Sequence, residues 1–168
     1  MSLSLLRTFA LLGAASFAPA ALADTATLTI SGRVLPGTCT LAAPAIDLDP
    51  IKADELAVGD NGLKAGALNF TGCVGVTKAT LSFDGTAATG DPQRWQNSAA
   101  DAAVGVSVAL KAGATGNTYL KRGDTGVEVP VAGATASYAL RAGYYVPSLA
   151  AAKAGAVQAE ITVTAAYE

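Results

Sequence analysis

Histidine is absent from the chain, and aromatic residues make up only 6% of it. Without histidine, neither a Ser-His-Asp nor a Cys-His catalytic site can be built. The S-x-x-K motif and the Gly-Lys dipeptide of a phosphate-binding loop are missing as well. We therefore expect no catalytic residue and no cofactor, and a protein that is not an enzyme.

Charge is also scarce. The 11 basic and 13 acidic residues give a formal net charge of −2 and make up 14% of the chain. Proteins that bind nucleic acids concentrate lysine and arginine on one surface, so we expect no nucleic-acid partner. Because 51% of the residues are hydrophobic, the chain has enough apolar side chains to form a core rather than remain disordered.

No apolar run is long enough to span a bilayer. The first residues instead have the three parts of a secretory signal peptide. A single positive charge at Arg7 precedes the apolar stretch TFALLGAA at 8–15, and small residues end in Ala-Leu-Ala at 21–23. We predict a signal peptide over residues 1–23, followed by one domain of ordinary size.

The two cysteines, Cys39 and Cys73, both lie in the predicted exported part. A pair of cysteines in an exported protein is typical of one disulfide bond, with two free thiols or half of a metal site as alternatives. The absence of histidine makes the metal site a weak alternative. Five acidic residues between the two cysteines could in principle bind calcium, namely Asp47, Asp49, Asp54, Glu55 and Asp60. Their spacing matches no EF-hand loop. We therefore interpret this segment as a solvated acidic loop and predict no metal site.

Short runs of alternating apolar and polar residues, separated by Gly, Asp, Asn and Pro, predict an all-β sandwich. Pro130 places its strand at a sheet edge. The predicted strands cover residues 26–34, 67–70, 77–83, 104–110, 127–131, 138–144 and 157–167. Turn-rich stretches lie between them, at 47–62, at 85–103 with the single tryptophan, and at 147–155, where a short helical turn would end at Gly155.

Both ends of the exported chain are strands with one apolar face. Two such strands can pair within one molecule, or they can belong to different molecules and join by β-strand addition. An unpaired apolar edge is otherwise an aggregation hazard, and alternation alone does not decide between these arrangements.

Several short motifs extend along the whole exported chain: ISGRVLPGTC at 30–39, FTGC at 70–73, FDG at 83–85, VGVSV at 104–108 and LRAGY at 140–144. In addition, the glycine at position 155 stands fourteenth from the end of the sequence and Tyr167 stands next to last. In their order and spacing, these motifs resemble those of chaperone–usher (type 1-like) fimbrial subunits.

This resemblance implies an incomplete immunoglobulin-like β-sandwich that lacks its final strand and carries an N-terminal donor-strand extension. The extension would cover residues 24–34 and the pilin domain residues 35–168. Within the extension, alternate residues would fill pockets of a neighbouring subunit, with the glycine at a constriction: Ala26, Leu28, Ile30, Gly32 and Val34. The strand bordering the groove, which also pairs with a chaperone, would present Gly155, Val157, Ala159, Ile161, Val163, Ala165 and Tyr167.

The resemblance also implies the partners and the location. A periplasmic pilus chaperone would fill the groove with one of its own strands and hold the carboxylate of Glu168. At an outer-membrane usher, the chaperone's strand would be replaced by the extension of a neighbouring pilin. The protein would then be a structural subunit of a cell-surface fimbrium that supports adhesion. The extension, 15 residues before Cys39, is shorter than in many rod subunits. It favours an adaptor or minor subunit without settling that role, and the length leaves no room for a separate lectin domain.

Two other functions remain as alternatives. The first is a self-contained, secreted carbohydrate-binding β-sandwich, whose aromatic platform would have to come from Trp95 or from Tyr144 and Tyr145. The second is a secreted enzyme, against which the missing histidine and missing motifs argue.

Overall fold

The computed structural model describes residues 26–168, so the predicted signal peptide at 1–23 lies outside the described residues. The chain divides into a unit that ends at Arg33 and a domain that begins at Val34. Residues 26–33 have no regular secondary structure, and their side chains are exposed. The strand predicted for residues 26–34 is therefore not formed within the described residues.

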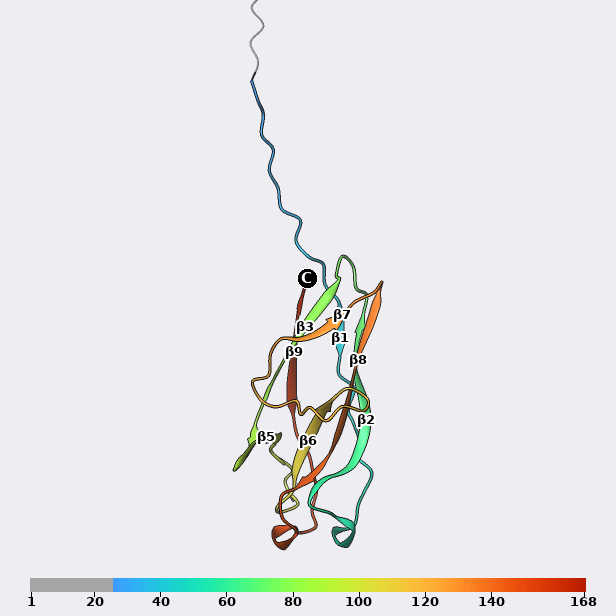
Figure 1. The fold of residues 1–168 in the computed structure, drawn as a ribbon, viewed down its shortest axis with the longest axis vertical. Coiled ribbons are helices and arrows are strands. Elements are labelled where there is room, and N and C mark those ends of the chain that lie inside the picture. Colours follow the sequence, from blue (N-terminus) through green and yellow to red (C-terminus); the bar gives the residue numbers. More distant parts are fainter. Residues whose placement is uncertain (1–25) are drawn as a thin grey trace, which may run out of the picture. The chain divides into compact units, whose positions relative to one another are not determined.

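The domain consists of short antiparallel strands and two single helical turns (Figure 1). Turn residues such as Gly, Asp and Asn separate the strands, as expected for a sandwich. The strands are β1 (Thr40–Ala42), β2 (Gly59–Thr71), β3 (Lys78–Gly85), β4 (Ala87–Ala88), β5 (Asp91–Trp95), β6 (Ser107–Ala112), β7 (Val127–Pro130), β8 (Thr135–Val146) and β9 (Ile161–Tyr167), and the 3₁₀ turns are η1 (Ala53–Glu55) and η2 (Leu149–Ala151).

The strands form two sheets. One sheet has the order β1-β2-β8-β6-β5-β4, and the other has the order β7-β3-β9. Strand β9 pairs with β3 along its whole length, from Ile161 opposite Gly85 to Tyr167 opposite Ala79. Because β9 stands last in its sheet, its second edge faces no strand of the described chain.

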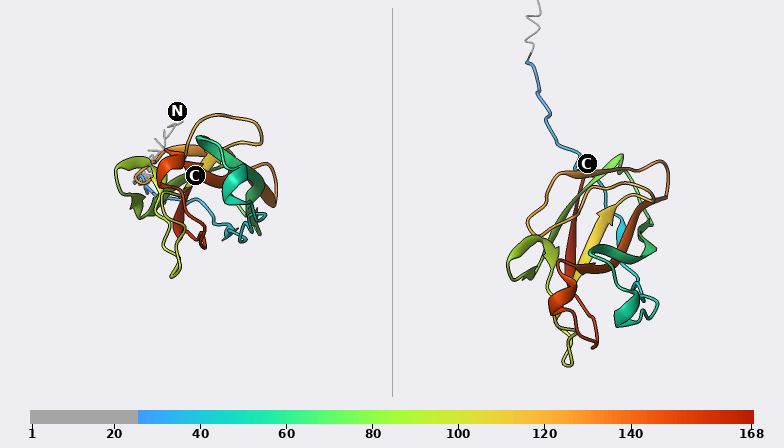
Figure 2. Two further views of the ribbon diagram at one scale, coloured as in Figure 1. Left: turned by 90° about the horizontal axis from the view of Figure 1, so that it is seen from below. Right: turned by 60° about the horizontal axis from the view of Figure 1, so that its bottom comes forward.

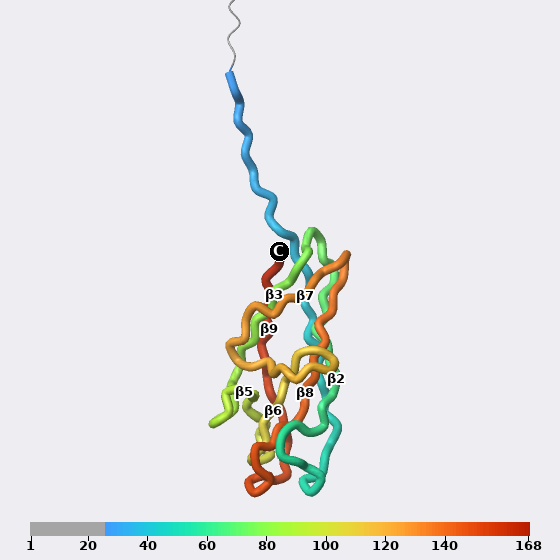
Figure 3. Tube along the Cα trace, in the orientation of Figure 1, coloured from blue at the N-terminus to red at the C-terminus, as the bar shows by residue number. Residues whose placement is uncertain are grey.

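The core lies between the inner faces of the two sheets. Its largest fully buried side chains are Trp95, Phe70, Phe83, Leu81 and Val146. The indole Nε1 of Trp95 donates a hydrogen bond to the carbonyl oxygen of Leu120 over 2.8 Å. Leu120 lies in the connection from β6 to β7, which crosses from one sheet to the other (Figure 3). This connection closes the side of the sandwich away from β9, where Phe83 N–H donates to the carbonyl oxygen of Asp124.

Most of the predicted strands are present. The expected edge strand is β7, at one end of the three-stranded sheet, and the expected helical turn near residue 150 is η2. The interpretation of residues 85–103 as one long loop was wrong, because β4 and β5 lie within it. Asp91, Pro92 and Gln93 are polar or strand-breaking, so β5 has no apolar alternation for a sequence pattern to detect.

The acidic segment is also more ordered than a loop. It holds η1, and β2 begins at Gly59. Carboxylates of this segment pair with separate lysines, Asp49 with Lys64 at 2.8 Å and Asp60 with Lys111 at 2.9 Å. Among residues 26–168, no three acidic, histidine or cysteine side chains form a group that could hold a metal ion. No helix in the same part of the chain is long and apolar enough to cross a membrane.

Candidate functional site

An apolar groove of about 650 Å³ runs beside the C-terminal segment. One wall is formed by residues 43–48 and the other by residues 157–163. The floor comes from inner-face side chains of both sheets, namely Ala67, Leu68, Phe83, Val108, Leu110, Leu140 and Ala142. No strand of the described chain lies between the two walls. The groove is the space that one further strand would occupy.

The C-terminal wall alternates strictly. Every second side chain is half-buried against the core, and the side chains between them are exposed. Six of the predicted groove-edge residues therefore share one face: Val157, Ala159, Ile161, Val163, Ala165 and Tyr167. The first four of these line the groove, whereas Ala165 and Tyr167 lie beyond its open part. This period of two is what a partner strand would need in order to continue the sheet.

The opposite wall is irregular. Strand β1 covers only three residues, and the segment 43–50 that follows it has no regular structure. Ile46 and Leu48 of this segment are half-buried and pack against the core. This wall therefore supplies apolar contacts rather than a second hydrogen-bonding edge of comparable length.

Asn97 holds one end of the groove in place. Its side chain is 6% exposed. Nδ2 donates to the carbonyl oxygen of Ala156 over 2.9 Å, and Oδ1 accepts from the N–H of Gln158 over 3.1 Å. The backbone on either side of Val157 is thereby fixed, which keeps the Val157 side chain turned into the groove.

Gly155 lies just before this segment and has a packing reason for its identity. A Cβ atom there would stand 2.5 Å from the backbone nitrogen of Ala103 and 2.7 Å from the carbonyl carbon of Ala102. Real Cβ atoms do not approach backbone that closely, so any larger residue would push the two segments apart. Gly155 thus allows the loop before β6 to support the groove wall.

At the other end, the two sheets are joined across the groove. The hydroxyl of Tyr167 donates to the carbonyl oxygen of Cys39 over 3.1 Å. The expected disulfide bond between Cys39 and Cys73 is present and connects the start of β1 to the end of β2. This end of the groove is therefore closed by a side-chain contact, whereas the middle is open.

The N-terminal extension carries large apolar side chains that are exposed in the described part of the chain. Leu28 is 83% exposed, Ile30 is 85% exposed and Val34 is 97% exposed. Isolated apolar residues on a surface are ordinary, but an alternating series of them is typical of an interaction segment.

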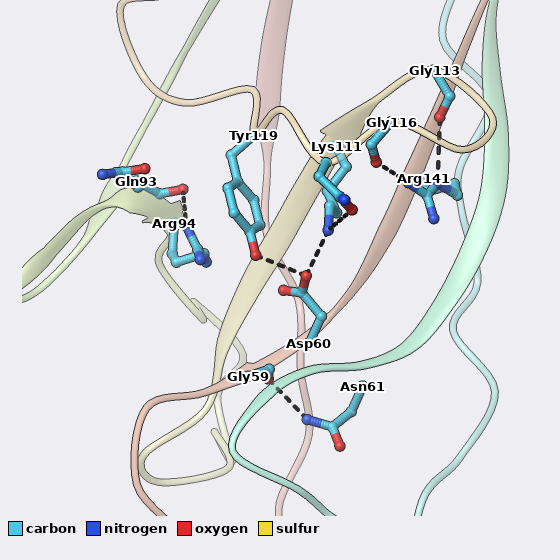
Figure 4. A network of polar contacts seen from close by, with 11 residues as sticks. Gly59, Asp60, Asn61, Gln93, Arg94, Lys111, Gly113, Gly116, Tyr119 and Arg141 are labelled. Atoms are coloured by element: carbon cyan, nitrogen blue, oxygen red, sulfur yellow. Dashed lines mark hydrogen bonds and ion pairs between the residues drawn. The ribbon is translucent and has the colours of Figure 1, made fainter.

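A polar network covers the outer face of the six-stranded sheet (Figure 4). Asp60 Oδ2 accepts from Lys111 Nζ over 2.9 Å and from the Tyr119 hydroxyl over 2.8 Å. The Arg94 guanidinium lies between the rings of Tyr119 and Tyr145, 3.5 and 3.9 Å from their centroids. Burial, together with the hydrogen bond to Asp60, raises the pKa of the Tyr119 hydroxyl. The network attaches the connection between β6 and β7 to the sheet, and it is a structural feature rather than a site open to ligands.

The aromatic side chains considered for sugar binding are not free to stack on a sugar. Trp95 is fully buried, so its ring cannot stack on a sugar. The ring of Tyr145 is occupied by Arg94, and the hydroxyl of Tyr144 donates to the carbonyl oxygen of Asp49 over 3.1 Å. These contacts remove the support for a carbohydrate-binding sandwich.

The geometry defines a class of protein: an antiparallel sandwich with one unfilled strand position beside its last strand. Comparison with known proteins agrees with this description. The family model of fimbrial proteins matches residues 28–168, and the chain belongs to the fimbrial protein family. No curated protein sequence matches the chain.

Solved structures show the same fold. The P pilus rod subunit PapA is similar with a TM-score of 0.63 at 15% identity, over 77% of this chain and 99% of PapA. An antigen and type I fimbria protein of Burkholderia pseudomallei is similar with a TM-score of 0.59 at 25% identity, over 79% and 90% of the two chains. A subunit in the structure of a chaperone–usher pilus has a TM-score of 0.63 at 15% identity, over 90% and 100%.

The CupB6 tip adhesin of Pseudomonas aeruginosa also matches, with a TM-score of 0.63 at 16% identity. The match covers 77% of this chain but only 38% of the adhesin, so the present chain corresponds to part of that longer protein. The fold is that of chaperone–usher pilus subunits, an immunoglobulin-like sandwich without its final strand, as the sequence motifs predicted.

Proposed function

We propose that this fimbrial subunit polymerises by donor-strand exchange, with residues 24–34 of one subunit filling the groove of the next. One observation carries the proposal: a groove that lacks one strand and an exposed segment with alternating apolar residues occur in the same chain. The groove is bordered by the free edge of β9, and the extension leaves most of the Leu28 and Ile30 side chains exposed.

The two patterns are complementary. The groove wall turns an apolar side chain inward at every second position from Val157 to Val163. The extension has its apolar side chains at the same spacing. Burying Leu28, Ile30 and Val34 would contribute about 1.5–3 kcal/mol each, and each main-chain hydrogen bond to β9 would add about 0.5–1.5 kcal/mol.

We place the donated strand antiparallel to β9, because all ladders between the named strands of this sandwich are antiparallel. With Ala26 of the donor opposite Tyr167 of the acceptor, Val34 would lie opposite Ala159, next to Val157 on the same face. Consecutive subunits would follow one another head to tail.

Before assembly, the same apolar groove needs a temporary partner. We propose that a periplasmic chaperone supplies it, that an outer-membrane usher exchanges it for the next subunit, and that the finished fibre stands on the cell surface and supports adhesion. The groove has no catalytic constellation, and its role is structural. The free edge of β9 supports this proposal, since an unprotected edge of this kind would otherwise promote aggregation.

The proposal is tested with the exported chain and a version that lacks residues 24–34, each expressed with a matched chaperone. The full chain should polymerise. The shortened chain should not, but it should bind a synthetic peptide of residues 24–34 and be stabilised by it. A shortened chain that stays monomeric without chaperone and ignores the peptide would refute donor-strand exchange. A peptide with Leu28 and Ile30 replaced by serine is the matched control.

A further inference from the structure

Only a short piece of chain separates the proposed donor strand from its own domain. Val34 is the last residue that fills the groove, and the N–H of Gly37 is already bonded to the carbonyl oxygen of Gly75 over 3.3 Å. Three residue steps of extended chain cover at most about 11 Å. A donated strand therefore brings the donor domain directly against the end of the acceptor groove.

The surface of the donor that arrives there is apolar. Leu35 is 69% exposed and Val74 is 75% exposed. The two lie on adjacent segments, because Val74 N–H donates to the carbonyl oxygen of Thr38 over 3.3 Å. A Cβ at Gly37 would stand 1.5 Å from the carbonyl oxygen of Val74, so the segments pack without a side chain between them. We call Leu35 and Val74 the donor end.

The matching end of the acceptor contains a second apolar pocket of about 260 Å³. It lies at the end of the domain that carries η1 and η2, which Figure 2 brings forward. Val157 and Tyr144 line both this pocket and the groove, so the two are adjacent. The other large apolar lining residues are Ile51, Leu56 and Val106, and Lys153 is the one charged residue of the lining.

We propose that the donor end of each subunit seats on this pocket in the subunit that accepts its strand. The occupant is a second copy of the chain, and the inference rests on donor-strand exchange as proposed above. Leu35 follows the last residue in the groove and reaches the mouth of the pocket, while Val74 covers its rim. Consecutive domains are then held in a fixed orientation by an apolar contact in addition to the shared strand.

The test places a photo-crosslinking amino acid at position 74 of the exported chain and polymerises it. Crosslinks in the fibre should fall in segments 50–56 or 153–157 of the neighbouring subunit. The same probe at Thr162, on the exposed face of β9, is the matched control and should give no crosslink to these segments. Fibres in which the position-74 probe reacts elsewhere, or not at all, overturn the proposal.

A second measurement uses the Leu35→Asp variant, whose side chain lies outside the groove-filling series. Joints between its subunits should dissociate about tenfold faster or more, since each 1.4 kcal/mol of lost contact is tenfold. The isolated peptide of residues 24–34 should still bind the variant as it binds the original chain. Unchanged dissociation overturns the end-to-end contact, whereas failure of the peptide to bind the original chain overturns donor-strand exchange itself.

Discussion

Tyr167 and Cys39 are joined by a hydrogen bond of 3.1 Å from the tyrosine hydroxyl to the backbone carbonyl oxygen. They are 128 positions apart in the chain and belong to opposite sides of the groove. Cys39 is in turn bonded to Cys73, at the end of β2. The last strand of one sheet is thereby connected to the first two strands of the other.

Replacing Tyr167 by phenylalanine removes this hydrogen bond and keeps the ring. We expect the free energy of unfolding, measured with urea on the peptide-filled subunit, to fall by about 0.5–1.5 kcal/mol. Tyr138→Phe is the control, because the Tyr138 hydroxyl makes no hydrogen bond within residues 26–168. Equal losses in the two variants would contradict a specific role for the contact.

Gly32→Leu should weaken the joint between subunits. An added Cβ at Gly32 meets no atom of residues 26–168 within 4 Å, so the subunit should fold normally. In the groove of a neighbour, the same side chain would enter the predicted constriction. Polymers of this variant should melt at lower temperature than polymers of Ser31→Leu, whose side chain would point away from the groove in the proposed strand. Equal melting would reject the proposed position of Gly32.

Asn97→Ala should damage the groove more than the rest of the domain. The change leaves the N–H of Gln158 without its partner and removes one of the two hydrogen bonds that the carbonyl oxygen of Ala156 accepts. An unpaired backbone group of this kind costs about 1–3 kcal/mol. We expect weaker binding of the peptide of residues 24–34, measured by calorimetry. Asn69→Ala, at an exposed asparagine on β2, is the matched control and should bind the peptide normally. Equal peptide affinity in both variants would contradict a positioning role for Asn97.

Lys111→Met should be strongly destabilising. The side chains of Lys111 and Asp60 are 7% and 15% exposed, so the change leaves a largely buried carboxylate without its cation. Loss of one partner of a buried pair costs about 3–5 kcal/mol. The double variant Lys111→Met, Asp60→Leu should recover part of this loss in the same urea measurement. A double variant that is no more stable than the single one would show that the charge left behind is not the cause.

Asp84 should contribute to the stability of the domain in weak acid. The N–H of Gly85, and then Arg122, lower the pKa of the Asp84 carboxyl from its ordinary value of 3.8. Because the folded state holds the ionised form more strongly, this contribution is present above pH 3.8 and is lost as the pH falls through the lowered pKa. The melting temperature of Asp84→Asn should therefore fall less steeply than that of the original chain in this range. Arg122→Gln should show a smaller change in the same direction, and identical pH profiles in all three proteins would contradict the assignment.

Much of the architecture could be predicted from the sequence because period-two alternation follows directly from one buried face. Strands such as β8 and β9 have that pattern. Strand β5 does not, since three polar or strand-breaking residues precede its two buried side chains, Arg94 on the outer face and Trp95 in the core. Its pairing with β4 and β6 and the hydrogen bond from Trp95 to Leu120 depend on the folded chain.

The groove was predictable in part. The C-terminal wall follows from its alternation, but the wall at residues 43–48 has no periodicity that would identify it. The positioning role of Asn97 could not be predicted either, because asparagine is common near turns in any sequence. Its role depends on Ala156 and Gln158, about 60 positions away, and only the folded chain brings them together.

The short segment Gly37 to Cys39 is the point through which tension in a fibre would enter each subunit. A force on the extension first reaches Gly37, which is hydrogen-bonded to Gly75, and two residues later the disulfide at Cys39 transmits it to the end of β2. The hydroxyl of Tyr167 transmits part of this force to β9, the strand that would pair with the neighbour's extension. A stretched fibre would therefore load both sheets together and would not peel β1 away from its sheet one residue at a time.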